Sequence, residues 1–208
     1  MQEPVTPSNR KTWDHISSKI TELNLIKSGK SVIVKHGANE YKLVPYPEVE
    51  HVKLVREEGL IKPEKVSEDW IAQWKANGSN IRIFAVENTL LALTRGGYLL
   101  DWKPYKALIE SPINERLVEA TENGRYLLFG ELVGRDSLVR LCISEWREFL
   151  ETNIDYLIFD IYDLETRKFL PIKTVEDFAK NHNLKIIKTE WNWSYEKLNE
   201  MMKKFLEI

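Results

Sequence analysis

The chain has 208 residues, of which 43% are hydrophobic, and this length can bury a core in one large domain or in one domain with a smaller appendage. Its 30 Lys and Arg residues are balanced by 32 Asp and Glu residues, and the resulting net charge of −2 excludes a global basic field, so a nucleic-acid partner needs a local patch. The single Cys142 excludes an intrachain disulfide, which favours a reducing, cytoplasmic compartment. The sequence has no signal-peptide core and no apolar run near the roughly 20 residues of a membrane span, so we expect a soluble protein.

The first 62 residues are expected to form a small helix-plus-hairpin module. Apolar residues recur at three- and four-residue steps between residues 11 and 27, which predicts an amphipathic helix closed by Gly29. The stretch SVIVKHGANEYKLVPY, residues 31–46, predicts two short strands around the turn HGAN. We place a soft domain boundary near residue 62, with the N-terminal module over 1–62 and a second domain over 63–208.

The second domain is expected to be rich in strands. WIAQW, NIRIFAV and TLLALTR, which begin at residues 70, 80 and 89, are apolar or alternating runs separated by short turn sequences. This spacing favours an antiparallel meander over a parallel strand–helix–strand unit. RYLLFGELVG (125–134) and YLIFDIYDL (156–164) indicate two further, buried strands.

Helices are expected between these strands. Ser111 is a candidate N-cap, with Pro112 at the first helical position, for a helix over about 112–123. SEWREFLET, residues 144–152, predicts a helix between the two buried strands.

Two more helices are predicted towards the end of the sequence. Thr174 with Asp177 resembles a capping box that opens the helix VEDFAKNH, residues 175–182, and Ser194 opens a final amphipathic helix over 195–208. Together, the elements predict an α+β fold built on an antiparallel sheet.

Two cations lie in turn-like sequences. Lys75 interrupts an apolar run and is followed by Asn77 and Gly78, small residues beside which a phosphate can approach the backbone. A nucleophilic lysine needs a lowered pKa from partial burial and neighbouring cations, whereas the alternative is a solvated lysine beside an Asn-Gly hairpin turn. Arg95, in LTRGGY, would reach the same end of the sheet, an arrangement that suits a polyphosphate; the alternative is a plain Gly-Gly turn.

Two residues of the buried strands also carry functional hypotheses. Glu131 is a carboxylate flanked by apolar residues and glycine, and such a group needs a cation, a metal or hydrogen bonds. Phe159 is first of all a core residue and only secondly a platform on which a base could stack.

Taken in order, K-x-N-G, T-R-G-G, F-G-E-L-V-G and F-D-I-Y-D resemble the nucleotidyltransferase motifs of ATP-dependent polynucleotide ligases, and most closely those of RNA ligases of the archaeal type. The resemblance covers roughly residues 45–190. It implies an antiparallel-sheet nucleotidyltransferase (adenylation) fold. The partner molecules that it implies are ATP, Mg²⁺ and RNA ends.

The family's reaction has three steps. By resemblance, Lys75 attacks the α-phosphate of ATP to form a lysyl-adenylate, AMP passes to an RNA 5′-phosphate, and a 3′-hydroxyl displaces it. Asn77 and Gly78 are expected to shape the lysine loop, and Arg82 points to the same neighbourhood if the strand alternates.

The remaining roles also follow from the resemblance. Arg95 is expected to contact the nucleotide or the incoming phosphate, Glu131 the ribose or a metal-bound water, and Phe159 the adenine ring. Magnesium is expected to screen the triphosphate and to assist in-line displacement.

The sequence departs from the family pattern at two places. Trp74 stands where relatives often have an acidic residue that helps to read adenine. Downstream of Phe159 we find neither an E-G-x-V strand nor a closing K-x-K, and Lys203 and Lys204 fit a solvated helix face better than a substitute.

Three hypotheses follow. In the first, the chain is an active ATP-dependent RNA ligase or its adenylation part, either truncated or completed by a separately encoded chain. In the second, it is a degenerate relative that binds nucleotide or RNA ends without completing ligation. In the third, it is an interaction domain with an accidental resemblance. RNA specificity rests on the resemblance, because the aromatic and basic residues of DWKPYK, residues 101–106, would equally suit single-stranded DNA or packing. The oligomeric state is open: relatives of the archaeal type pair as dimers, so the resemblance leaves a homodimer and a separately encoded C-terminal part as alternatives. The N-terminal module has no assignable role.

Overall fold

The computed structural model divides the chain into two compact units. The larger unit contains Met1–Tyr46 and Ala76–Ile186, and the smaller unit contains Pro47–Lys75 and Ile187–Ile208. The predicted boundary near residue 62 lies within the Pro47–Lys75 segment of the smaller unit. The structure describes these residues: 2–6, 20, 22–48, 54–57, 60–63, 71–136, 153–190, 197 and 200.

An N-terminal antiparallel sheet opens the larger unit. Its strands, in spatial order, are β1 (Gln2–Pro4), β2 (Asn24–Ser28), β3 (Ser31–His36) and β4 (Asn39–Leu43). The predicted hairpin over 31–46 is confirmed as β3 and β4. The helix predicted over 11–27 is wrong at residues 24–27, where Leu25 and Ile26 pair with β3 and pairing overrides the helical period; residues 11–19 lie outside the described part of the chain. Gly29, with φ +61°, forms the turn into β3.

The central sheet of the larger unit is mostly antiparallel and has the strand order β12-β11-β10-β8-β9, with β13 added parallel to β11. Its strands are β8 (Ser79–Val86), β9 (Thr89–Thr94), β10 (Tyr126–Val133), β11 (Asp155–Asp163), β12 (Lys168–Phe169) and β13 (Lys185–Ile186). The meander is confirmed for β8 and β9, and both buried strands are confirmed as β10 and β11.

The first strand of the expected meander behaves differently. Of the described residues of WIAQW, 71–74, Ala72–Gln73 form a strand, β7, which pairs with β14 (Thr189–Glu190) inside the smaller unit instead of with β8. The smaller unit also contains a hairpin of β5 (Leu54–Glu57) and β6 (Leu60–Pro63).

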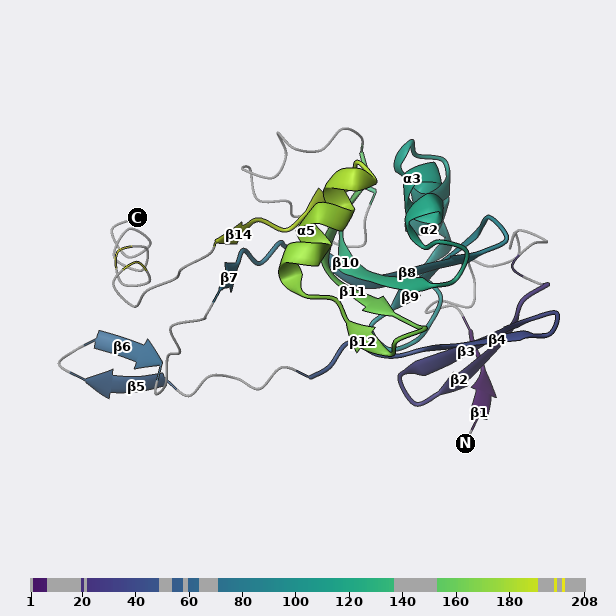
Figure 1. The fold of residues 1–208 in the computed structure, drawn as a ribbon, viewed down its shortest axis with the longest axis horizontal. Coiled ribbons are helices and arrows are strands. Elements are labelled where there is room, and N and C mark those ends of the chain that lie inside the picture. Colours follow the sequence, from purple (N-terminus) through teal and green to yellow (C-terminus); the bar gives the residue numbers. More distant parts are fainter. Residues whose placement is uncertain are drawn as a thin grey trace. The chain divides into compact units, whose positions relative to one another are not determined.

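Three helices of the larger unit, α2 (Trp102–Ile109), α3 (Ile113–Ala120) and α5 (Ile172–Asn181), lie on one side of the central sheet, and the N-terminal sheet lies on the other (Figure 1). Helix α3 confirms the prediction over 112–123, but Ser111 is not its cap, because its hydroxyl donates to the carbonyl of Leu108 at 2.7 Å.

The other helix predictions have mixed outcomes. Helix α2 occupies the DWKPYK stretch, where none was expected. Helix α5 begins before the supposed capping box of Thr174 and Asp177, which lies inside it and makes no capping hydrogen bond. The helix predicted over 144–152 lies outside the described residues, as does that over 195–208 except for residues 197 and 200, which are helical.

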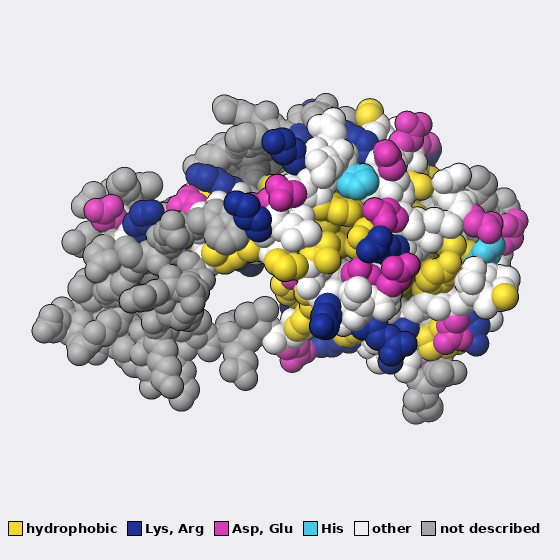
Figure 2. All heavy atoms as spheres, viewed as in Figure 1, with side chains coloured by type: hydrophobic (Ala, Val, Ile, Leu, Met, Phe, Trp, Pro, Cys, Tyr) yellow, Lys and Arg dark blue, Asp and Glu magenta, His cyan; other side chains and the backbone are white. Residues whose placement is uncertain are grey.

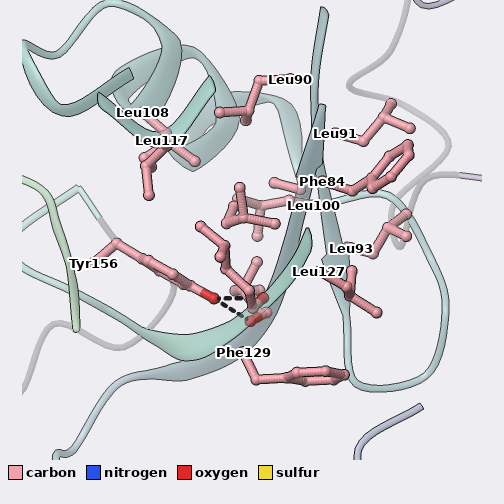
Figure 3. Close-up of a cluster of buried hydrophobic side chains, with 14 of the residues drawn as sticks. Phe84, Leu90, Leu91, Leu93, Leu100, Leu108, Leu117, Leu127, Phe129 and Tyr156 are labelled. Atoms are coloured by element: carbon pink, nitrogen blue, oxygen red, sulfur yellow. Dashed lines mark hydrogen bonds between the residues drawn. The ribbon is translucent and has the colours of Figure 1, made fainter. Parts of the chain in front are cut away.

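The core of the larger unit has a layer on each face of the central sheet (Figure 3). Leu90, Leu108 and Leu117 fill the helix side, whereas Phe84 and Leu91 face the other way. Because both faces are covered, the inner strands read as continuous apolar runs.

Tyr156 crosses the helix-side layer. Its hydroxyl donates to the carbonyl of Ile81 at 2.8 Å and lies 3.0 Å from the carbonyl of Leu128 (Figure 3). A Cβ on Gly130 would come within 2.5 Å of the Tyr156 ring. The glycine of FGELVG is therefore required by packing.

Arg82 joins the N-terminal sheet to the central sheet. The side chain is 1% exposed. Nη1 donates to the carbonyl of Val44 at 2.8 Å, and Nη2 donates to those of Lys30 at 3.0 Å and Thr94 at 3.3 Å. Burial lowers the pKa of Arg82 to about 10, and among the described residues no carboxylate pairs with it. Backbone carbonyls from both sheets therefore compensate the buried charge.

We expect Arg82→Leu to lower the free energy of unfolding by about 3 kcal/mol, because several carbonyls lose their donor where water has little access. Arg82→Lys, which retains the charge without the planar fork, should give an intermediate loss. Urea unfolding followed by circular dichroism measures both. Lys180→Leu, at an exposed position of α5, is the control; an equal loss there would contradict the role given to Arg82.

Candidate active site

Gly78 of the K-x-N-G motif contacts β10. The backbone N–H of Gly78 donates to Oε1 of Glu131 at 3.1 Å. A Cβ at Gly78 would lie 2.4 Å from the carbonyl oxygen of Leu132, so only glycine permits this approach. The sequence correctly required a partner for the Glu131 carboxylate, and one such partner is a backbone N–H of the loop.

Strand pairing brings the T-R-G-G turn to the same end of the central sheet. Asn80 at the start of β8 pairs with Glu131, and the next residue, Ile81, pairs with Thr94 at the end of β9. The turn is closed by the N–H of Gly97, which donates to the carbonyl of Thr94 at 2.9 Å. Arg95, at the tip of this turn, is exposed. Gly78, Glu131 and Arg95 therefore occupy one end of the sheet.

Lys75 and Trp74 belong to the smaller unit. Lys75 is exposed, whereas Trp74 makes two contacts through its ring and one through its backbone. Its Nε1 donates to Oε1 of Glu190 at 3.1 Å, its backbone N–H donates to the carbonyl of Lys188 at 3.0 Å, and Nζ of Lys188 lies 5.2 Å from the ring centroid. Trp74 thus holds strands β7 and β14 together. Asn77, in the larger unit, is exposed.

Phe159 lies at an irregularity in the central sheet. Phe129 of β10 pairs with Asp160, and Gly130 pairs with Ile158, so Phe159 is an extra residue on β11. Such a bulge turns a side chain away from its regular position. The Phe159 ring is half-buried and meets Tyr46 edge-on at a centroid distance of 5.1 Å.

Tyr46 and Asp160 form a polar pair beside Phe159. The Tyr46 hydroxyl donates to Oδ2 of Asp160 at 3.2 Å. Burial raises the pKa of Asp160 to about 6, although the hydrogen bonds from Ile161 and Tyr46 oppose this shift. Burial, together with the Asp160 charge, raises the pKa of Tyr46 to about 12.

Sequence reasoning missed this pair for two different reasons. Asp160 stands in the F-D-I-Y-D motif, in which the resemblance assigns a role to Phe159 and none to Asp160. Tyr46 had no local signal, because it lies 114 positions from its partner.

Arg82 does not lie free beside the lysine loop. Its guanidinium donates to the carbonyls of Val44, Lys30 and Thr94, which join the two sheets. The structure therefore gives Arg82 a structural role and does not expose it to a ligand.

A cleft of about 710 Å³ lies elsewhere, where β10 begins at Tyr126. Arg125, one of its lining residues, is already paired with Glu122 at 3.2 Å, Asp163 at 3.4 Å and Glu165 at 3.4 Å. Basic and acidic side chains are interspersed over the face drawn in Figure 2. The cleft is thus separate from the end of the sheet that carries Glu131.

Among the described residues, no group of three or more His, Cys, Asp or Glu side chains is placed to hold a metal ion. None of the helices in the described ranges has the length and apolar character needed to cross a membrane.

A family profile described as RNA ligase matches residues 68–208, which is more than half of the chain and includes the Gly78–Glu131 contact. The chain belongs to the RNA ligase family. The predicted family is therefore confirmed.

Solved structures agree with this RNA ligase assignment at the level of fold. Form 1 of an archaeal ATP-dependent RNA ligase matches with a TM-score of 0.63 and 19% identity, over 89% of this chain and 49% of that one. Form 2 matches with a TM-score of 0.61 and 18% identity, over 90% and 46%. A putative ATP-dependent DNA ligase from Aquifex aeolicus gives 0.57 and 17%, over 91% and 54%. The α+β, antiparallel-sheet nucleotidyltransferase fold is confirmed.

The RNA ligase family member described here spans about half the length of these structural relatives. An uncharacterized protein of Methanocaldococcus jannaschii is 30% identical over 118 residues, which are 57% of this chain and 29% of that protein.

The raised pKa of Asp160 predicts a pH effect on stability. Its pKa is about 6 in the folded protein against 3.8 for an ordinary aspartate, so the folded state retains a proton that the unfolded state releases. The free energy of unfolding should therefore fall as pH rises from about 4 to about 6 and level off above, with the half-exposed carboxyl limiting the size of the fall.

Asp160→Asn should remove this fall, because the amide does not titrate. Thermal melting between pH 4 and pH 7 measures it, with Asp177→Asn at an exposed position of α5 as the control. A fall that persists unchanged in Asp160→Asn would show that another group causes it.

Proposed function

We propose that this chain is the adenylation part of an ATP-dependent RNA ligase, which forms a lysyl-AMP intermediate at Lys75 and seals 5′-phosphate to 3′-hydroxyl RNA ends. The observation that carries the proposal is the contact between Gly78 N–H and the Glu131 carboxylate, which ties two of the family-like motifs together at one end of the sheet. Arg95 lies at this end too. Membership of the RNA ligase family supports it.

The first step is a nucleophilic displacement at phosphorus. The neutral amine of Lys75 attacks the α-phosphorus of ATP, a P–N bond forms, the bond to the bridging oxygen breaks, and pyrophosphate leaves. The displaced amine proton passes to solvent. AMP then passes to an RNA 5′-phosphate, and a 3′-hydroxyl attacks that phosphorus and releases AMP.

The other residues position the nucleotide. Arg95 supplies positive charge to the nucleotide or the incoming phosphate, and Glu131 contacts the ribose or a metal-bound water. Asn77 and Gly78 shape the lysine loop, and the Phe159 ring stacks on adenine. The sequence proposes Arg82 as a neighbour of the nucleotide. Arg82 supports this end of the sheet indirectly, because its Nη2 donates to the carbonyl of Thr94, the residue before Arg95.

Magnesium is proposed as a companion of ATP. Mg²⁺ keeps several waters and binds mainly through substrate phosphates, so it would accompany the triphosphate. When bound, it would neutralise phosphate charge. The carboxylate of Glu131 is the candidate contact to its water shell.

The proposed setting is cytoplasmic RNA repair of the archaeal type. The partners would be ATP and RNA ends, with either a homodimer or a separately encoded C-terminal part completing the enzyme.

A second candidate function is a degenerate or split ligase homologue that binds nucleotide or RNA ends without completing ligation. The observation that favours it is that Trp74, which stands where relatives often have an acidic residue that helps to read adenine, is engaged with Glu190 and Lys188.

Adenylation distinguishes the two. The protein is mixed with α-³²P-labelled ATP and Mg²⁺ without RNA and run on a denaturing gel. We expect covalent label on the wild type and a loss of at least roughly 100-fold in Lys75→Ala, because the nucleophile is gone.

The matched control is Lys103→Ala, at an exposed position of α2, which should retain the label. Absence of label on every protein would overturn the enzyme proposal for this chain and leave the binding homologue. Label that persists in Lys75→Ala would place the nucleophile elsewhere.

A further inference from the structure

Four side chains of the larger unit form a surface that the proposed adenylation chemistry does not use as a whole. We call Lys27, Lys30, Arg95 and Tyr98 the Tyr98 patch. Among the residues that the structure describes, Tyr98 is the large hydrophobic side chain that stands exposed, at 39%. Nζ of Lys27 lies 4.5 Å from the centroid of its ring. An aromatic ring is thus exposed beside a cation.

The fold brings this patch together from two distant turns. Nη2 of Arg82 donates both to the carbonyl of Lys30, in the turn between β2 and β3, and to that of Thr94, directly before Arg95. The two turns also touch, since a Cβ on Gly97 would lie 3.0 Å from the carbonyl oxygen of Lys30. One buried guanidinium therefore fixes the exposed Lys30 and Arg95 next to each other.

Charge around the patch is mainly positive. Among the described residues, Lys27, Lys30 and Arg95 contribute three cations, and the strand register places the acidic Glu3 opposite Lys27 across β1 and β2.

We propose that the Tyr98 patch binds single-stranded RNA, with Lys27 and Lys30 on successive phosphates and the Tyr98 ring against a base or sugar. Cations combined with an exposed aromatic ring are the chemistry by which proteins hold single strands. Arg95 lies at the border of the patch, so a strand whose phosphate end reaches it would continue over Tyr98 onto the N-terminal sheet. The choice of RNA as the ligand rests on the proposed ligase function.

Fluorescence anisotropy tests the proposal with a 5′-fluorescein-labelled 12-nucleotide RNA in the absence of ATP. Lys27→Gln/Lys30→Gln should weaken binding roughly tenfold at 0.1 M salt and reduce the slope of log K against log salt by about 1.4, since each phosphate contact on a single strand contributes about 0.7.

The matched control is Lys168→Gln/Lys173→Gln, which removes two exposed lysines from β12 and α5. It should bind like the wild type. An equal loss in both double variants would show that only net charge matters and would overturn the proposal, as would unchanged binding in Lys27→Gln/Lys30→Gln.

The ring has a separate test. Tyr98→Ala should weaken binding at least roughly fivefold, because a base–aromatic contact contributes about 1–3 kcal/mol, whereas Tyr98→Phe should retain most of the affinity. Thermal melts confirm that both variants are folded. Equal affinity of Tyr98→Ala and wild type would remove the ring from the proposed site, and tighter binding of a DNA strand of the same sequence would overturn the assignment to RNA.

The two proposals can fail separately. The anisotropy measurement contains no ATP, and the labelling reaction contains no RNA. RNA binding that depends on the Tyr98 patch, without any lysyl-AMP, would overturn the adenylation proposal and support the RNA-binding proposal. Lysyl-AMP without patch-dependent RNA binding would support adenylation and overturn the RNA-binding proposal.

Discussion

The buried guanidinium of Arg82 is the interaction on which the arrangement of the larger unit depends. A charge that is 1% exposed is costly to bury, and here carbonyls from β9, from the turn after β2 and from the chain after β4 compensate it. Each of these segments must therefore bring a carbonyl to the Arg82 guanidinium. The requirement to satisfy one cation therefore joins the N-terminal sheet to the central sheet and sets the position of the turn that carries Arg95.

Close backbone approach is the second constraint, and it explains residues that a motif alone would assign to chemistry. Gly78 lies against the carbonyl of Leu132, and Gly130 lies under the Tyr156 ring. The glycines in KANG and FGELVG are thus packing requirements of β10, whatever ligand binds nearby. The bulge at Phe159 adds an extra residue opposite the same strand. Three of the four family-like motifs, K-x-N-G, F-G-E-L-V-G and F-D-I-Y-D, therefore meet at β10.

Sequence patterning predicted the elements whose partners lie near in the chain or whose period is regular. β3 with β4, β8 with β9, and helix α3 follow from alternation and from turn or cap residues close by. Residues 24–27 failed because pairing with β3 overrode a helical period. The partner of β7 could not be predicted, since β14 lies 116 positions away, and neither could the bond from Tyr46 to Asp160. Arg82 was assigned to the nucleotide from strand alternation, which gives the face of a side chain but not what covers that face.

The N-terminal sheet consequently has a place in the candidate site, although its sequence carries no motif. The chain segment that follows its last strand places Tyr46 against Phe159. The turn that contains Lys30 contacts the T-R-G-G turn. Both contacts lie inside one compact unit. The N-terminal sheet therefore contributes residues that surround Phe159 and Arg95 and is not a separate appendage. Since Tyr46 packs on the ring expected to hold adenine, and Lys30 lies beside the arginine expected to meet phosphate, a change in the docking of this sheet would alter both ends of the nucleotide's surroundings at once.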